Sequence, residues 1–91
     1  MRVNGVGGEL RAGGRWAARL GTWSGELTPD GGTVRARVAQ ADPWWIERGP
    51  FVLDLRLGES VWRWRGAEAY VEGEAVQITM QGDREVVRYA T

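Results

Sequence analysis

The stretch that decides the fold is residues 49–73, GPFVLDLRLGESVWRWRGAEAYVEG. Apolar side chains stand at every second position of residues 51–57, a pattern typical of a strand with one buried face. A Gly-Glu pair at positions 58–59 then provides a two-residue turn, and the alternation resumes with Trp62 and Trp64. The stretch therefore predicts a β-hairpin with leucines and tryptophans on one face.

The two-residue turn also predicts how the two arms of this hairpin pair. It places Leu55 opposite Trp62, Leu53 opposite Trp64 and, on the other face, Asp54 opposite Arg63. Aromatic rings interleaved with arginines could stack on nucleic-acid bases or could fill a core. Because Trp62 and Trp64 share their face with leucines, we expect both rings in the core, with Arg63 outside near Asp54.

A second hairpin is predicted in residues 23–39, WSGELTPDGGTVRARVA, with a four-residue turn at 29–32. That turn would pair Leu27 with Val34, Gly25 with Ala36, Trp23 with Val38 and Glu26 with Arg35. Just upstream, Trp16, Ala18 and Leu20 lie on one side, whereas Trp23 has the opposite parity. We therefore expect a bulge or bend near Gly21, as where a sheet turns a barrel corner.

Residues 69–90, AYVEGEAVQITMQGDREVVRYA, read as three strands joined by turns at 72–73 and 82–83. Val76, Ile78 and Met80 alternate toward one face. The second turn would pair Ile78 with Val87 and Val76 with Tyr89.

Residues 40–50, QADPWWIERGP, interrupt the strand pattern and predict a single helical turn. Asp42 suits the cap and Pro43 the first helical position, and Gly49 with Pro50 ends the turn. The adjacent rings of Trp44 and Trp45 cannot easily occupy one core, so one of them is expected to be exposed or covered by a partner. The alternative is that either ring plugs an open end of the barrel. The candidate interface residues are Trp44, Trp45, Ile46 and Arg48.

These patterns together predict an all-β fold, a small barrel or sandwich of seven to eight short antiparallel strands with one short helical turn. Residues 1–91 read as a single β-domain. Residues 1–8, MRVNGVGG, are glycine-rich and predict a flexible N-terminal arm, with ordering on a partner as the alternative.

The composition excludes several classes of function. The twelve basic and twelve acidic residues cancel, so the field that attracts nucleic acid or anionic membrane is lacking and a nucleic-acid partner is disfavoured. Cys, His and Lys are absent, so no nucleophile–base pair and no common metal site can be assembled. We expect no enzymatic activity, no cofactor, no membrane span and no signal peptide. The pattern names no small-molecule ligand and no compartment.

Residues 42–72, DPWWIERGPFVLDLRLGESVWRWRGAEAYVE, resemble small all-β virion proteins of tailed bacteriophages, in which glycine-turned hairpins with tryptophan cores recur in decoration, connector and tail components. The resemblance implies non-enzymatic assembly by a rigid β-domain with flexible arms in a symmetric ring or lattice. It carries over no functional residue.

The expected function is a non-enzymatic structural or interaction module that works by docking to a protein partner or to a second copy, and the resemblance implies a virion as its place of action. The arginine-rich composition suits an interface, although a GC-rich coding bias explains it as well. The alternative is a small β-barrel binding domain for carbohydrate or single-stranded nucleic acid.

Because no ligand cluster is found in the sequence, we expect folding to need neither metal nor organic cofactor. A chelator should leave the thermal unfolding transition of the purified protein unchanged, as followed by tryptophan fluorescence. A clear fall in the unfolding midpoint with chelator would show that a metal site had been missed.

Overall fold

The computed structural model describes residues 1–88 and shows an all-β fold, a closed six-stranded antiparallel barrel with a seventh strand added at one side. The predicted fold class is thus confirmed, and of its two forms the chain adopts the barrel. The elements are β1 (Arg2–Ala12), β2 (Arg15–Thr28), β3 (Gly31–Ala41), the 3-10 turn η1 (Trp45–Arg48), β4 (Phe51–Leu57), β5 (Ser60–Glu72), β6 (Ala75–Gln81) and β7 (Glu85–Arg88).

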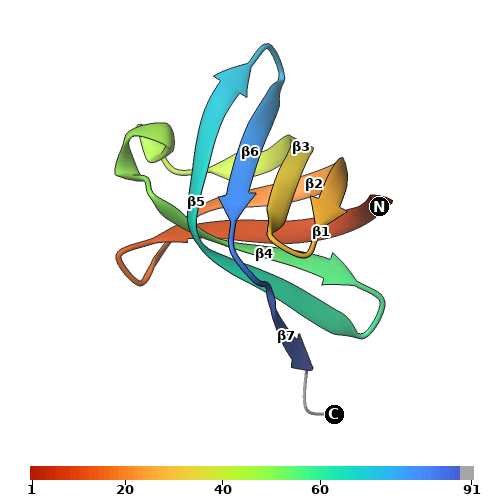
Figure 1. Cartoon of the computed structure of the whole chain (residues 1–91). Coiled ribbons are helices and arrows are strands. Elements are labelled where there is room, and N and C mark those ends of the chain that lie inside the picture. The colour runs from red at the N-terminus through yellow and green to blue at the C-terminus, as the bar shows by residue number, and fades with distance from the viewer. Residues whose placement is uncertain (89–91) are drawn as a thin grey trace.

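The barrel consists of two three-stranded meanders that meet along two seams (Figure 1). Strands β1, β2 and β3 pair in sequence, as do β4, β5 and β6, and the β1–β4 and β3–β6 pairings close the ring. Strand β4 therefore returns beside β1, which is the Greek-key order. The segment between β3 and β4 contains η1 and connects the two meanders.

The β4–β5 hairpin has the predicted register. Leu55 pairs with Trp62, Leu53 with Trp64 and Asp54 with Arg63. The Trp64 ring is 2% exposed and lies in the core, as predicted. The prediction for Trp62 was only partly right, because this ring packs against the core but is half-buried, and the guanidinium of Arg84 lies 4.1 Å from its centroid.

The predicted register of the β2–β3 hairpin was wrong by two residues. The turn consists of residues 29–30 only, and Leu27 pairs with Gly32, Gly25 with Val34, Trp23 with Ala36 and Ser24 with Arg35. Gly32 continues the strand with φ 146°, and a Cβ there would collide with the carbonyl oxygen of Glu26. The glycine is thus required for close approach of two strands and not for the turn.

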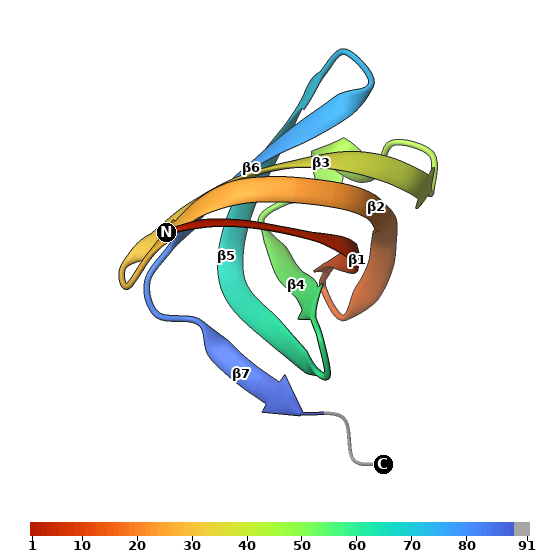
Figure 2. The ribbon, with the colours of Figure 1, turned by 90° about the vertical axis from the view of Figure 1, so that its right-hand side faces the viewer.

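The bend predicted near Gly21 is confirmed. Buried side chains change parity between Leu20 and Trp23, and the β2–β3 register shifts at the same place. The facing strand bends too, because Gly7 has φ 94° and its carbonyl accepts a 3.1 Å hydrogen bond from the Trp23 indole. Both strands of the β1–β2 pair therefore turn the same barrel corner, visible as strong curvature in Figure 2.

The C-terminal strands differ from the prediction in partner and turn. The β5–β6 turn lies at 73–74 instead of 72–73, because Glu72 pairs with Ala75. Val76, Ile78 and Met80 are buried on one face as predicted. Strand β6 is flanked by β3 and β5, so it has no free edge for β7, and the expected pair of Ile78 with Val87 does not form.

Strand β7 instead extends the line of β6 along β5. Trp62 pairs with Val86 and Val61 with Val87. The expected partner of Val76, Tyr89, lies outside the described residues. Because β7 pairs with β5 alone among the described strands, it adds to the closed barrel without being part of its ring.

The flexible arm predicted for residues 1–8 was wrong. These residues belong largely to β1, which pairs with β2 from Arg2 onward. The N-terminus itself is held, because the Met1 ammonium group donates to the Leu27 carbonyl at 2.9 Å and the Leu27 amide donates to the Met1 carbonyl at 2.8 Å. The glycines of this segment therefore belong to a bent, paired strand and not to a flexible arm.

The single core lies inside the barrel and is formed by every strand of the ring. Its largest members are Leu10, Leu20, Trp23, Leu27, Phe51, Leu53, Leu55, Trp64, Ile78 and Met80.

The difference between the two hairpin tryptophans predicts unequal effects of their removal. Trp64→Ala should lower the free energy of unfolding by about 3–5 kcal/mol, because a fully buried ring leaves a cavity. Trp62→Ala should cost about 1–2 kcal/mol, since part of its ring is already in water. Urea denaturation of both variants measures the two losses, and equal losses would contradict the observed packing.

Candidate docking surface

A buried carboxylate, that of Asp54, links three strands of the barrel. Asp54, on the outer face of β4, is 6% exposed. Arg63 of β5 holds it with two hydrogen bonds, Nε to Oδ1 at 2.8 Å and Nη2 to Oδ2 at 3.0 Å. Arg11 of β1 donates from Nη2 to Oδ2 at 2.7 Å and also contacts Glu9 at 2.8 Å. Asp54 therefore joins three adjacent strands, including the β1–β4 seam.

The surroundings of Asp54 determine its ionisation. Burial raises the pKa of Asp54, but hydrogen bonds and charge from Arg63, together with charge and a hydrogen bond from Arg11, outweigh it, so that the pKa lies below its usual value. The carboxylate in turn raises the pKa of Arg63. Both groups are therefore charged at neutral pH. The sequence predicted their pairing, but not the burial of Asp54 or the contribution of Arg11.

The predicted helical turn is present as η1, and two of the candidate interface residues on it face the barrel. Trp45 and Ile46 are half-buried and pack against the core. The Trp45 ring lies 5.7 Å from the Phe51 ring, centroid to centroid, at 48°. The Trp45 ring thus packs onto the first residue of β4, as the alternative interpretation of this segment expected for one of the two tryptophans.

Trp44 has the opposite orientation and is 77% exposed. It precedes η1 with φ 60° and ψ 20°, and within residues 1–88 no other non-glycine residue has positive φ. A bulky side chain in the left-handed region costs about 1–2 kcal/mol, and an exposed indole gains little from burial to offset it. The expectation that one of the two rings is exposed is confirmed, and the ring is that of Trp44.

The loop around Trp44 is fixed by polar contacts. The predicted side-chain cap by Asp42 was wrong, because the carboxylate binds the Arg48 guanidinium at 3.2 Å instead of a backbone amide. Arg48 also donates to the carbonyl of Trp16 at 3.4 Å, and the amide of Asp42 donates to that of Ala17 at 3.0 Å. Arg48, predicted as an interface residue, thus ties η1 to β2.

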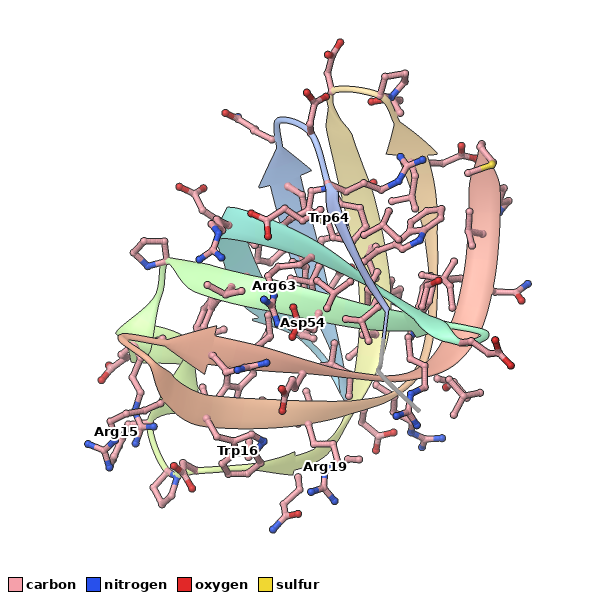
Figure 3. All side chains as sticks on the ribbon, turned by 90° about the horizontal axis from the view of Figure 1, so that it is seen from below. Arg15, Trp16, Arg19, Asp54, Arg63 and Trp64 are labelled. Atoms are coloured by element: carbon pink, nitrogen blue, oxygen red, sulfur yellow. The ribbon has the colours of Figure 1, made fainter. Side chains whose placement is uncertain are left out.

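Next to this loop lies a cationic face formed by Arg15, Trp16 and Arg19, on the outer side of β2 (Figure 3). Both arginines are exposed and Trp16 is half-buried. Within residues 1–88 no ion pair, hydrogen bond or ring contact engages either guanidinium. Two positive charges therefore flank an indole and face solvent.

Other described arginines are engaged, which sets this face apart. The ion pairs are Arg2–Glu26, Arg11–Glu9, Arg11–Asp54, Arg35–Glu72, Arg37–Glu74, Arg48–Asp42, Arg63–Asp54 and Arg65–Glu85. Arg35 is exposed, and its ion-pair partner is Glu72 and not the predicted Glu26.

Sequence reasoning missed the cationic face because a bulge creates it. Leu10 pairs with Ala18 but Arg11 with Trp16, so Ala17 is an extra residue on β2. The extra residue brings Trp16 and Arg19, three positions apart, to the same outer face. The prediction that Trp16 shares a side with Ala18 and Leu20 was therefore wrong.

Two hollows lie on the outer surface. One of about 390 Å³ lies over β2, β3 and β6, where its charged lining residues Arg35, Arg37 and Glu74 take part in ion pairs. Another, of about 250 Å³, lies beside Asp54 and Arg19. Charged side chains line both hollows, and the larger one also has apolar lining from Trp23, Ala36 and Ala75.

Within residues 1–88, no three acidic side chains gather closely enough to hold a metal ion. None of the helical segments described is long and apolar enough to cross a membrane. Comparison of the chain with protein families, with curated proteins and with solved structures found no match.

The Asp54 cluster predicts a specific dependence of stability on pH. Because the pKa of Asp54 is lower in the folded than in the unfolded chain, its contribution is fully present above the unfolded-state value, about 3.9, and is lost as the pH falls through the folded-state value. Asp54→Asn should lower the free energy of unfolding by about 1.5–3 kcal/mol at pH 7, since the half-buried guanidinium groups of Arg63 and Arg11 lose a charged hydrogen-bond partner.

Urea denaturation between pH 7 and pH 2 measures this effect, and the gap between wild type and Asp54→Asn should narrow at the acid end. Glu59→Gln is the matched control, because Glu59 is exposed in the β4–β5 turn and should change little at any pH. A gap that stays constant with pH would show that the charge of Asp54 is unimportant.

Proposed function

We propose that this protein is a non-enzymatic docking module that binds another protein surface through the loop at 42–50, with Trp44 as the anchor. The observation that carries the proposal is the exposed indole of Trp44, held in a left-handed conformation by a loop that is otherwise well fixed. Strained residues of this kind persist where the surroundings over-determine them, and they cluster at functional positions.

The backbone strain at Trp44 is not offset by burial of its side chain in the isolated chain. Trp44 contributes little to the isolated fold, because 77% of it is in water while its backbone is strained. Its burial on a partner would remove a large apolar area from water without further ordering of the loop. Tryptophan is also among the residue types that dominate binding energy at protein interfaces.

The site of action that we propose is the virion of a tailed bacteriophage, as a decoration, connector or tail component. The support is the resemblance of residues 42–72 to such proteins, together with a rigid barrel that presents a preformed contact. Docking through preformed surfaces suits assembly into a ring or lattice, because little conformational entropy is lost on binding.

The alternative function is binding of carbohydrate or single-stranded nucleic acid by the exposed ring of Trp44. A single accessible ring beside the arginines of the cationic face favours it. The two functions differ in salt dependence, because a strand that contacts several phosphates loses affinity steeply as salt rises. Titration with a fluorescent oligonucleotide at several salt concentrations therefore separates them.

Substitution of Trp44 should separate docking from folding. Trp44→Gly should raise the free energy of unfolding by about 0.5–1 kcal/mol, because glycine adopts the left-handed conformation without strain. Trp44→Ala should leave stability within about 0.5 kcal/mol. Both variants should lose the association that wild type shows in sedimentation velocity at rising concentration.

Trp45→Ala is the control with the same change of side chain. It should lower the free energy of unfolding by about 1–3 kcal/mol, because Trp45 packs on Phe51 and the core. If Trp44→Ala unfolds the monomer as Trp45→Ala does, or if Trp44→Ala and Trp44→Gly associate as wild type does, the loop is structural and the proposed function is wrong.

A further inference from the structure

The cationic face adjoins the loop at 42–50, so the two can form one continuous surface. Arg48 of η1 donates to the backbone of Trp16, so Trp44 and the cationic face belong to adjoining parts of the surface. Two unpaired guanidinium groups beside an indole suit a partner that offers a carboxylate next to an apolar or aromatic side chain. The same chain offers such a combination elsewhere.

That combination lies on the β5–β6 hairpin, which rises beyond the other strands in both Figure 1 and Figure 2. Tyr70 is 54% and Val71 55% exposed, so the hairpin shows apolar side chains on both of its faces. Glu68 is exposed two residues before Tyr70, hence on the same face. No ion pair or hydrogen bond within residues 1–88 engages the Glu68 carboxylate.

Four further described carboxylates also lack an ion pair, and their positions favour Glu68 as the partner group. Asp30, Glu59 and Asp83 lie in turns or in the link to β7, and Glu47 lies on η1 itself. Glu68 differs because it shares a strand face with an exposed aromatic ring, on an arm that projects from the barrel. It combines charge with contact area, whereas the others offer mainly charge.

We infer that the cationic face, Arg15, Trp16 and Arg19, receives the β5–β6 hairpin of a second copy of this chain. Glu68 pairs with the arginines and Tyr70 packs on Trp16, with Trp44 at the border of the contact. The inference rests on the proposed docking function and names its partner. Because the donor and receiving surfaces differ, the contact either closes a symmetric pair that forms it twice or repeats from head to tail as a closed ring or an open filament.

Charge reversal tests the contact. Arg15→Glu/Arg19→Glu and Glu68→Arg should each weaken self-association by about tenfold or more in sedimentation velocity at low salt, because like charges would then face each other. The triple variant that combines all three reversals should regain association. A mixture of the double variant with Glu68→Arg should form mixed species, although each alone stays monomeric.

Glu59→Arg is the matched control for Glu68→Arg, with the same change of charge at an exposed residue of the β4–β5 turn outside the proposed contact, and it should associate as wild type does. Thermal unfolding of every variant confirms that the monomer remains folded. A wild type that stays monomeric up to millimolar concentration, or a triple variant that fails to regain association, would overturn the inference.

Two results separate this inference from the proposed function. If Trp44→Ala abolishes association but the reversals at 15, 19 and 68 do not, the docking function stands and the assigned partner surface is wrong. If an oligonucleotide binds the protein and Arg15→Glu/Arg19→Glu removes that binding while Glu68→Arg does not, the face serves a nucleic acid and the inference is overturned.

Discussion

The hydrogen bonds that Arg63 and Arg11 donate to the buried carboxylate of Asp54 are the interaction on which the rest of the structure depends. Arg63 sets the register of the β4–β5 hairpin from one side, and Arg11 reaches the same carboxylate from β1. A slip of one residue at either pairing would turn leucines to solvent and leave a buried charge unpaired. One carboxylate therefore specifies both a local hairpin and the long-range seam at which the barrel closes.

How much could be predicted from the sequence depended on whether pairing was local. The β4–β5 hairpin was predicted residue by residue, because a two-residue turn leaves one register. In the β2–β3 hairpin, Gly32 was assigned to the turn, although close approach to Glu26 is what requires it. The partner of β7 was missed because β3 and β5 flank β6, which no local pattern around Gly82 reveals.

The candidate surface was predictable to the same limited degree. That Trp44 and Trp45 diverge follows from their adjacency, but which ring is buried depends on Phe51, which begins a strand of the other meander. The cationic face could not be found from a chain with twelve arginines and twelve acids, since unpaired arginines emerge only once the pairs of the others are known. The bulge at Ala17, which aligns Trp16 with Arg19, is likewise a property of the paired strands.

The same contacts that complete the fold also position its exposed residues. Trp45 packs on Phe51, whereas the neighbouring Trp44 lies in solvent. Arg48 links η1 to β2 beside the bulge, so a hydrogen bond connects the loop to the cationic face. A surface built in this way loses little entropy when it binds. The backbone strain at Trp44 lowers the stability of the fold. The barrel, whose strand register is specified by the hydrogen bonds to Asp54, is stable enough to offset this strain and to keep an aromatic side chain exposed.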